Sequence, residues 1–155
     1  MNNRLLPILL VALVASGCSR EKAEGGASAA KAPTAAPAEA VAAVLQSGGT
    51  PIAKLGFIVV TRPVVGAQSE LRLEILAAAA VPALQVRIEA DALTIDPSTA
   101  QVSVSLEAGK TLSHQVKFTP QREGLTEVTV RLKSEEDSET VYVIPVEVAA
   151  TTGGA

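Results

Sequence analysis

Apolar and polar side chains alternate along most of the chain from Lys54 to Val148, and this period of two is typical of strands that bury one face. Seven such runs are expected to be strands, at 54–61, 69–76, 84–88, 102–106, 112–118, 128–132 and 140–148, and 93–95 is a short additional one. Glycine, proline and charged residues interrupt the runs at intervals of about ten residues. The pattern predicts an all-β domain over residues 50–149, built as two packed sheets.

Part of this region resembles a known class of domain. LRLEI at 71–75 and LQVRI at 84–88, followed by LEAGKTLSHQVKFTPQREGLTEVTVRL at 106–132, resemble bacterial Ig-like modules of the cell-adhesion-related class and adaptin-appendage-like domains. The chain lacks the cysteine pair and core tryptophan of antibody domains, and Leu125-Thr126 offers no tyrosine corner. The resemblance implies an immunoglobulin-like β-sandwich of about seven strands that is not an antibody-type domain.

The first residues show a different pattern. Arg4 is followed by an unbroken apolar run at 5–14 and then by three small residues, which is the layout of a secretory signal peptide at 1–17. The uncharged run is shorter than the ~18–20 residues that a helix needs to cross a bilayer. We therefore expect a cleaved signal and not a permanent transmembrane helix.

The sequence Ala15-Ser16-Gly17-Cys18 resembles the lipobox of bacterial lipoproteins, although that family prefers leucine where Ala15 stands. The resemblance implies that Cys18, the single cysteine, carries diacylglycerol and a further acyl chain such as palmitate after cleavage. Each buried methylene contributes about 0.8 kcal/mol, so several chains would hold the protein firmly on a membrane. Ser19 in place of aspartate implies sorting to the outer membrane of the cell envelope, with the domain facing the periplasm or the surface. An ordinary signal with an incidental cysteine is the alternative.

Residues 18–49 are expected to be a flexible linker, because alanine, glycine, proline and serine dominate them and bury too little apolar surface to offset their ordering entropy. Within the linker, a short helix at 37–46 is a further expectation. Pro37 suits a first helical turn, and Val41, Val44 and Leu45 fall at helical spacing. Residues 150–155 are expected to be a flexible tail.

Composition and charge argue against several classes of function. The net charge of −3 disfavours nucleic-acid binding, and an aromatic content of 2% leaves few rings for stacking sugars or bases. No nucleophile motif accompanies His114, the single histidine, so we expect a residue at the rim of the core and no enzyme. The acidic residues at 135–139 include no glycine turn for calcium. We therefore expect no catalytic residue, no metal site and no cofactor.

Two of the predicted strands are apolar on both faces, which burial of one face does not require. If the first and last strands lie side by side at a sheet edge, Ile58, Val60, Val141 and Val143 form one outer apolar patch. Pro145 fits an edge strand. Either the short helix or a protein partner is expected to cover this patch, and we favour the partner.

Together these features indicate an envelope lipoprotein, anchored to the membrane through Cys18, whose Ig-like domain is a non-catalytic structural or protein-interaction module for an unidentified envelope protein. The alternative is a periplasmic carrier that holds a small hydrophobic ligand in a cleft between the sheets. Native mass spectrometry separates the two, because a carrier would retain its ligand through purification.

The substitution Cys18→Ser is expected to leave unprocessed or soluble precursor, because acylation of the thiol precedes cleavage in the lipoprotein family. Metabolic labelling with a fatty acid measures this directly. Equal label on the serine variant would contradict the assignment of Cys18.

Overall fold

The computed structural model describes residues 39–47, 50–136 and 138–151. The predicted signal peptide, Cys18, most of the predicted linker and the end of the tail lie outside the described residues. The described part contains ten strands: β1 (Val41–Ala42), β2 (Val44–Ser47), β3 (Ala53–Val59), β4 (Ser69–Ala77), β5 (Val81–Glu89), β6 (Leu93–Ile95), β7 (Gln101–Leu106), β8 (Thr111–Pro120), β9 (Gly124–Ser134) and β10 (Glu139–Val148). The protein is therefore all-β over this range, as the alternation predicts.

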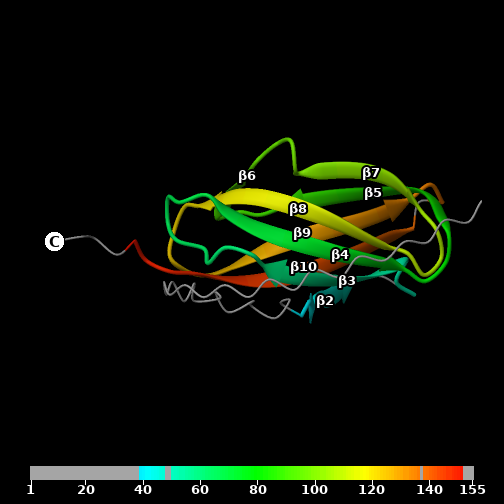
Figure 1. Ribbon diagram of the computed structural model, residues 1–155, viewed down its shortest axis with the longest axis horizontal. Helices are drawn as coiled ribbons and strands as arrows, with labels where there is room; N and C mark the ends of the chain where they lie inside the picture. The colour runs from blue at the N-terminus through cyan, green and yellow to red at the C-terminus, as the bar shows by residue number, and fades with distance from the viewer. Residues whose placement is uncertain (1–38, 48–49, 137, 152–155) are drawn as a thin grey trace, which may run out of the picture. The chain divides into compact units, whose positions relative to one another are not determined.

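The strands form two antiparallel sheets of five (Figure 1). Sheet A has the order β1-β3-β4-β8-β6, and sheet B has the order β2-β10-β9-β5-β7. Only β3–β4 and β9–β10 are consecutive strands within one sheet; at every other step from one described strand to the next the chain crosses to the other sheet. This is an immunoglobulin-like β-sandwich, and the predicted strands correspond to β3, β4, β5, β7, β8, β9 and β10, with β6 as the short addition.

The helix predicted at 37–46 is wrong over its described part. Val41–Ala42 pairs with β3 of sheet A, and Val44–Ser47 pairs with β10 of sheet B. β3 and β10 each have an edge that this segment can pair with, and backbone hydrogen bonds to a sheet outweigh the marginal stability of a helix of about ten residues. The valines also favour extended backbone. The folded domain consequently begins before residue 50, and 41–47 is not linker.

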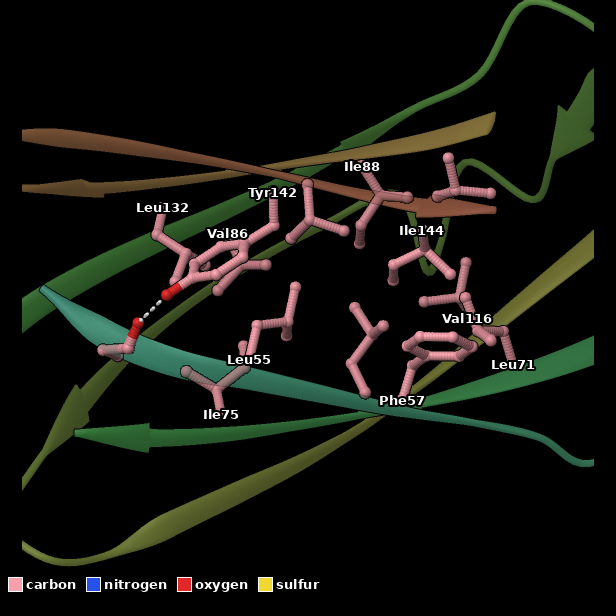
Figure 2. Packing of buried hydrophobic residues seen from close by; sticks show 14 of the residues in the cluster. Leu55, Phe57, Leu71, Ile75, Val86, Ile88, Val116, Leu132, Tyr142 and Ile144 are labelled. Atoms are coloured by element: carbon pink, nitrogen blue, oxygen red, sulfur yellow. Dashed lines mark hydrogen bonds between the residues drawn. The ribbon is translucent and has the colours of Figure 1, made fainter. Parts of the chain in front are cut away.

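The core lies between the two inner faces and is made almost wholly of aliphatic side chains. Figure 2 shows Leu55, Phe57 and Ile75 of sheet A facing Val86, Leu132, Tyr142 and Ile144 of sheet B. Many core side chains are fully buried: Leu71, Leu73, Ile75, Leu84, Val86, Val116, Val128, Val130, Leu132, Ile144 and Val146. Burial of this kind contributes about 1.5–3 kcal/mol for each large aliphatic side chain, so the domain is stabilised by apolar packing.

Two hydrogen bonds tie β10 of sheet B to the start of β3 in sheet A. The Tyr142 hydroxyl donates to the carbonyl of Ala53 at 2.6 Å, drawn as a dashed line in Figure 2. The Oγ1 of buried Thr140 accepts the backbone N–H of Ile52 at 3.2 Å. Each bond supplies a partner for a backbone group where the chain enters the sandwich, so the two sheets are held together at that point.

The other ends of β3 and β10 are also joined. After β3 the chain turns towards sheet B, and Val64 forms a parallel bridge with Ala149. The Ala149 N–H donates to the Pro63 carbonyl at 2.9 Å, and the Val65 N–H donates to the Ala149 carbonyl at 3.1 Å. The side of the sandwich that carries β3 and β10 is thus joined at both ends, by bonds between side chain and backbone at one end and by backbone–backbone bonds at the other.

A chain that begins at residue 39 is expected to melt at the temperature of the mature protein, whereas one that begins at Thr50 should melt about 5–10 °C lower. Removing β1 and β2 exposes backbone at both sheet edges and costs roughly 1–2 kcal/mol in a domain of this size. Thermal unfolding followed by circular dichroism measures the difference. Equal melting temperatures for the two truncations would show that 41–47 contributes nothing to the fold.

Tyr142→Phe should reduce the free energy of unfolding by about 1–3 kcal/mol at neutral pH, because the buried Ala53 carbonyl loses its donor. Burial raises the pKa of Tyr142. A raised pKa in the folded state means that the stability from the neutral phenol is present below about pH 10, the ordinary value, and is lost as pH rises through the folded-state pKa. Urea unfolding from pH 7 to 11 should therefore show a steeper alkaline loss for the parent than for Tyr142→Phe. Parallel pH profiles would contradict this.

Candidate functional site

The four residues of the predicted apolar patch do not share one exposed surface. Ile58, Val141 and Val143 are buried, with Val143 only 9% exposed, and among the described residues none of the three belongs to the cluster between the sheets. Val60 alone is open to solvent, at 49% exposure. Three of the four side chains are therefore not available to another molecule in this structure, and an interface made by all four stays a prediction.

The reason lies in the position of the first and last predicted strands. β3 belongs to sheet A and β10 to sheet B, so the expectation that they lie side by side in one sheet is wrong. Their edges lie on the same side of the sandwich, because β1 and β2, separated only by Ala43, pair with them in turn (Figure 1). The chain itself therefore pairs with the outer edges of β3 and β10, and the free edge lies one strand further out.

We call this outer edge, made of residues 41–47, the N-terminal edge. The Ala43 N–H donates to the Leu55 carbonyl at 2.9 Å, and the Ala43 side chain packs on the core. The large apolar side chains of the segment, Val41, Val44 and Leu45, are exposed, and Val44 reaches 60%. The sequence pattern predicts these three residues as one face of a helix that could cover the apolar patch, whereas the structure places them on two short strands.

The segment around the N-terminal edge carries no charged residue from Ala40 to Ala53. Proteins usually protect exposed sheet edges with charge, proline or short strands. All the described edges are short or polar: β1 has two residues and β2 has four, β6 has three and is followed by Asp96-Pro97, and β7 presents glutamine and serine side chains to solvent. The N-terminal edge is the one outer edge of the described sheets that presents large exposed apolar side chains.

A group of ion pairs covers the outer face of sheet B. Arg131, the cross-strand neighbour of Val141, bonds Glu89 at 3.2 Å and Glu139 at 3.3 Å, and Glu89 also bonds Arg87 at 2.8 Å. The hydrogen bonds to Glu89 and then Glu139 raise the pKa of Arg131. Because these groups are solvent-exposed, they contribute little to stability, and they give this face a charged character unlike that of the N-terminal edge.

His114 has a structural partner. The side chain is half-buried on β8, and its Nε2 lies 2.8 Å from the Thr99 carbonyl, which can only accept, so Nε2 carries the proton. Thr99 closes a turn whose first residue, Asp96, accepts hydrogen bonds from the N–H and hydroxyl of Ser98. Those bonds lower the pKa of the Asp96 carboxyl. His114 therefore fastens the connection before β7 to sheet A, in keeping with the expected rim position.

The described residues of the acidic hairpin belong to no cluster of metal ligands. Over residues 39–47, 50–136 and 138–151 no three histidine, cysteine or acidic side chains come together as metal ligands, and no helix is long and apolar enough to span a bilayer. A hollow of about 350 Å³ lies at the end of the sandwich, lined by 50–52, 78–82, 134–136 and Ser138. Val81 of the core cluster and the partly buried Ile52, which packs on that cluster, line this hollow, and its other lining residues lie at the strand ends and connections there.

No protein-family model matches the sequence, and no curated protein matches it. Solved structures with a similar chain path include a Niemann-Pick type C2 protein from the Japanese carpenter ant, with 13% identity, a TM-score of 0.48, and coverage of 68% of this chain and 99% of that one. A CARDB domain of the PF1109 protein from Pyrococcus furiosus, in complex with di-metal ions, has 17% identity, a TM-score of 0.44, and coverage of 67% and 95%. The ASH / PapD-like domain of human CEP192 has 14% identity, a TM-score of 0.39, and coverage of 77% and 99%. Likenesses this distant carry no argument about function, and the fold rests on the strand order.

The substitutions Val143→Lys and Val60→Lys form a matched pair. Lysine at buried Val143 should cost about 2–4 kcal/mol of stability, because its charge loses water, whereas lysine at exposed Val60 should change stability by less than about 0.5 kcal/mol. Chemical denaturation of both variants measures the contrast. If Val143→Lys is as stable as the parent, position 143 is open to solvent. The predicted patch of Ile58, Val60, Val141 and Val143 would then again be a candidate interface.

Proposed function

We propose that the protein is an envelope lipoprotein, held on the outer membrane through lipid on Cys18, whose Ig-like domain binds another protein without catalysing a reaction. The fold fits a module for interaction or ligand binding. The observation that carries the protein-binding role is the N-terminal edge, where Val41, Val44 and Leu45 are exposed on an uncharged outer strand. An edge of this kind takes up an extended strand through backbone hydrogen bonds.

Strand addition at this edge combines affinity with selectivity. The free backbone groups of β2 would bond any extended chain, while Val44 and Leu45 would select apolar side chains at alternate positions of the partner. The domain that presents the edge is rigid, because its core is closely packed and Ala43 is fixed to Leu55. A partner strand would thus be ordered on a fixed template, which lowers the entropic cost of binding.

The structure gives less support to the carrier of a small hydrophobic ligand. Such a carrier needs a cleft between the sheets, and the inner faces of this domain meet through fully buried leucine, isoleucine and valine side chains. Opening a ligand-sized space there would sacrifice several of these contacts at about 2–5 kcal/mol for each large side chain. We therefore do not propose a ligand between the sheets.

Photo-crosslinking in living cells tests the proposal. A photoreactive amino acid in place of Val44 should give a discrete protein adduct in the membrane fraction. The same group in place of Ser103, on the exposed polar edge at β7, is the matched control and should give none. Absence of an adduct at Val44, or the same adducts from both positions, would contradict a binding role for the N-terminal edge.

A further inference from the structure

The hollow of about 350 Å³ lies at the end of the sandwich where β9 turns into β10, and its two walls differ in chemistry. The first wall is mostly apolar and is made by residues 50–52, before β3, and by residues 78–82, from the end of β4 into β5. The second wall is the hairpin between β9 and β10, which contributes Ser134, Glu135, Glu136 and Ser138. A group bound in this hollow would therefore have hydrocarbon on one side and carboxylates on the other.

The fold holds both walls in place. In the first wall, Val81 is buried in the core cluster, and the Ala77 N–H just before the wall donates to the Lys110 carbonyl at 3.3 Å. In the second wall, the Ser134 N–H donates to the Ser138 carbonyl at 3.0 Å and closes the base of the hairpin. The hollow is thus formed by the domain itself, and a ligand does not have to order the chain around it.

Glu135 and Glu136 give the hollow a negative rim. Both side chains are exposed, and within the described part of the chain neither forms an ion pair, not even with the exposed Lys110 at the same end of the sandwich. Two adjacent carboxylates attract a positive group and repel an anion, while an uncharged hydrocarbon gains nothing from them. The chemistry of the two walls therefore fits an ammonium group at the tip of an aliphatic stem, because the stem can lie on apolar surface while the charge stays at the rim.

The hollow adjoins the N-terminal edge. Ser47, the last residue of β2, pairs with Val141 of β10. The preceding residue of β10, Thr140, accepts the N–H of Ile52, which belongs to the first wall of the hollow. A strand that pairs with β2 and continues past Ser47 would therefore bring its next side chains towards the hollow.

We propose that the hollow takes a lysine side chain of the protein that pairs with the N-terminal edge. The methylene stem of the lysine lies on the alanines at 78–80, and its ammonium group bonds Glu135 and Glu136. This assignment rests on the proposed function, and it describes the partner as an extended segment whose alternating apolar residues are followed by lysine. Backbone pairing alone does not choose a direction or a register, whereas a charge fixed at one end of the edge selects both.

Hexylammonium is a probe for the hollow that does not depend on the partner. The full-length protein, labelled with ¹³C at alanine methyl groups, is titrated by NMR with hexylammonium, with hexanol as the uncharged control and hexanoate as the anionic control. We expect saturable shifts of the methyl groups at 78–80 with a dissociation constant of about 1–10 mM for hexylammonium, and weaker binding of both controls. The double variant Glu135→Gln/Glu136→Gln should weaken hexylammonium binding at least about threefold. The matched variant Glu123→Gln/Glu127→Gln, with the same charge change at the other end of β9, should not.

The photo-crosslink at position 44 identifies the source of the ammonium group. In cells, Glu135→Gln/Glu136→Gln should lower the yield of the adduct at least about threefold, whereas Glu123→Gln/Glu127→Gln should leave it unchanged.

The outcomes separate this inference from the proposed function. Equal binding of hexylammonium and hexanol, or binding that the Glu135→Gln/Glu136→Gln variant does not weaken, overturns the site even if the adduct at position 44 forms. Glutamate-dependent binding of hexylammonium with an unchanged adduct overturns the lysine of the partner and assigns the hollow to a free aliphatic amine. Glutamate-dependent binding without any adduct contradicts the proposed function, and it likewise leaves the hollow to a free amine. Because both glutamates are exposed, the substitutions are not expected to unfold the domain.

Discussion

Without residues 41–47, β3 and β10 would each leave one strand edge unpaired, and the arrangement of this side of the structure depends on covering those two edges. Both edges lie on the same side of the sandwich in different sheets, and each would present a row of free N–H and C=O groups to another chain. One short segment covers both edges, because it pairs with β3 as far as Ala42 and with β10 from Val44 onwards. Gly56 accommodates this arrangement, since a side chain there would press on Ala40.

Closure of this side determines how the domain relates to its proposed anchor. Since the described strands begin at Val41, the part of 18–49 that remains as predicted linker is shorter than the composition implies. The same segment supplies the uncharged outer strand that we propose as the binding edge, so one stretch of sequence serves both the fold and the proposed recognition.

The sequence predicted the strands well because their signal is local. From Leu71 to Ile75 in β4 and from Leu84 to Ile88 in β5, apolar residues alternate with polar ones. The structure buries the apolar residues, while the polar ones between them are half-buried in β4 and exposed in β5. The segment 41–47 misled because Val41, Val44 and Leu45 satisfy helical spacing equally well, and only the edges of distant strands decide between the two forms. The expected neighbourhood of the first and last strands was wrong for a related reason: the pattern in β10 shows that both its faces are apolar, but not which sheet the strand joins.

Hydrogen exchange at the backbone amides of residues 41–47 tests the central claim most directly. If this segment closes the edges of both sheets, the amide of Ala43, which bonds the Leu55 carbonyl, exchanges far more slowly than that of an unstructured peptide. The account predicts protection at Ala43 and in β2, at a level between that of the core strands and that of the loops. Exchange across 41–47 at the rate of a free peptide, while β4 and β9 stay protected, would contradict it.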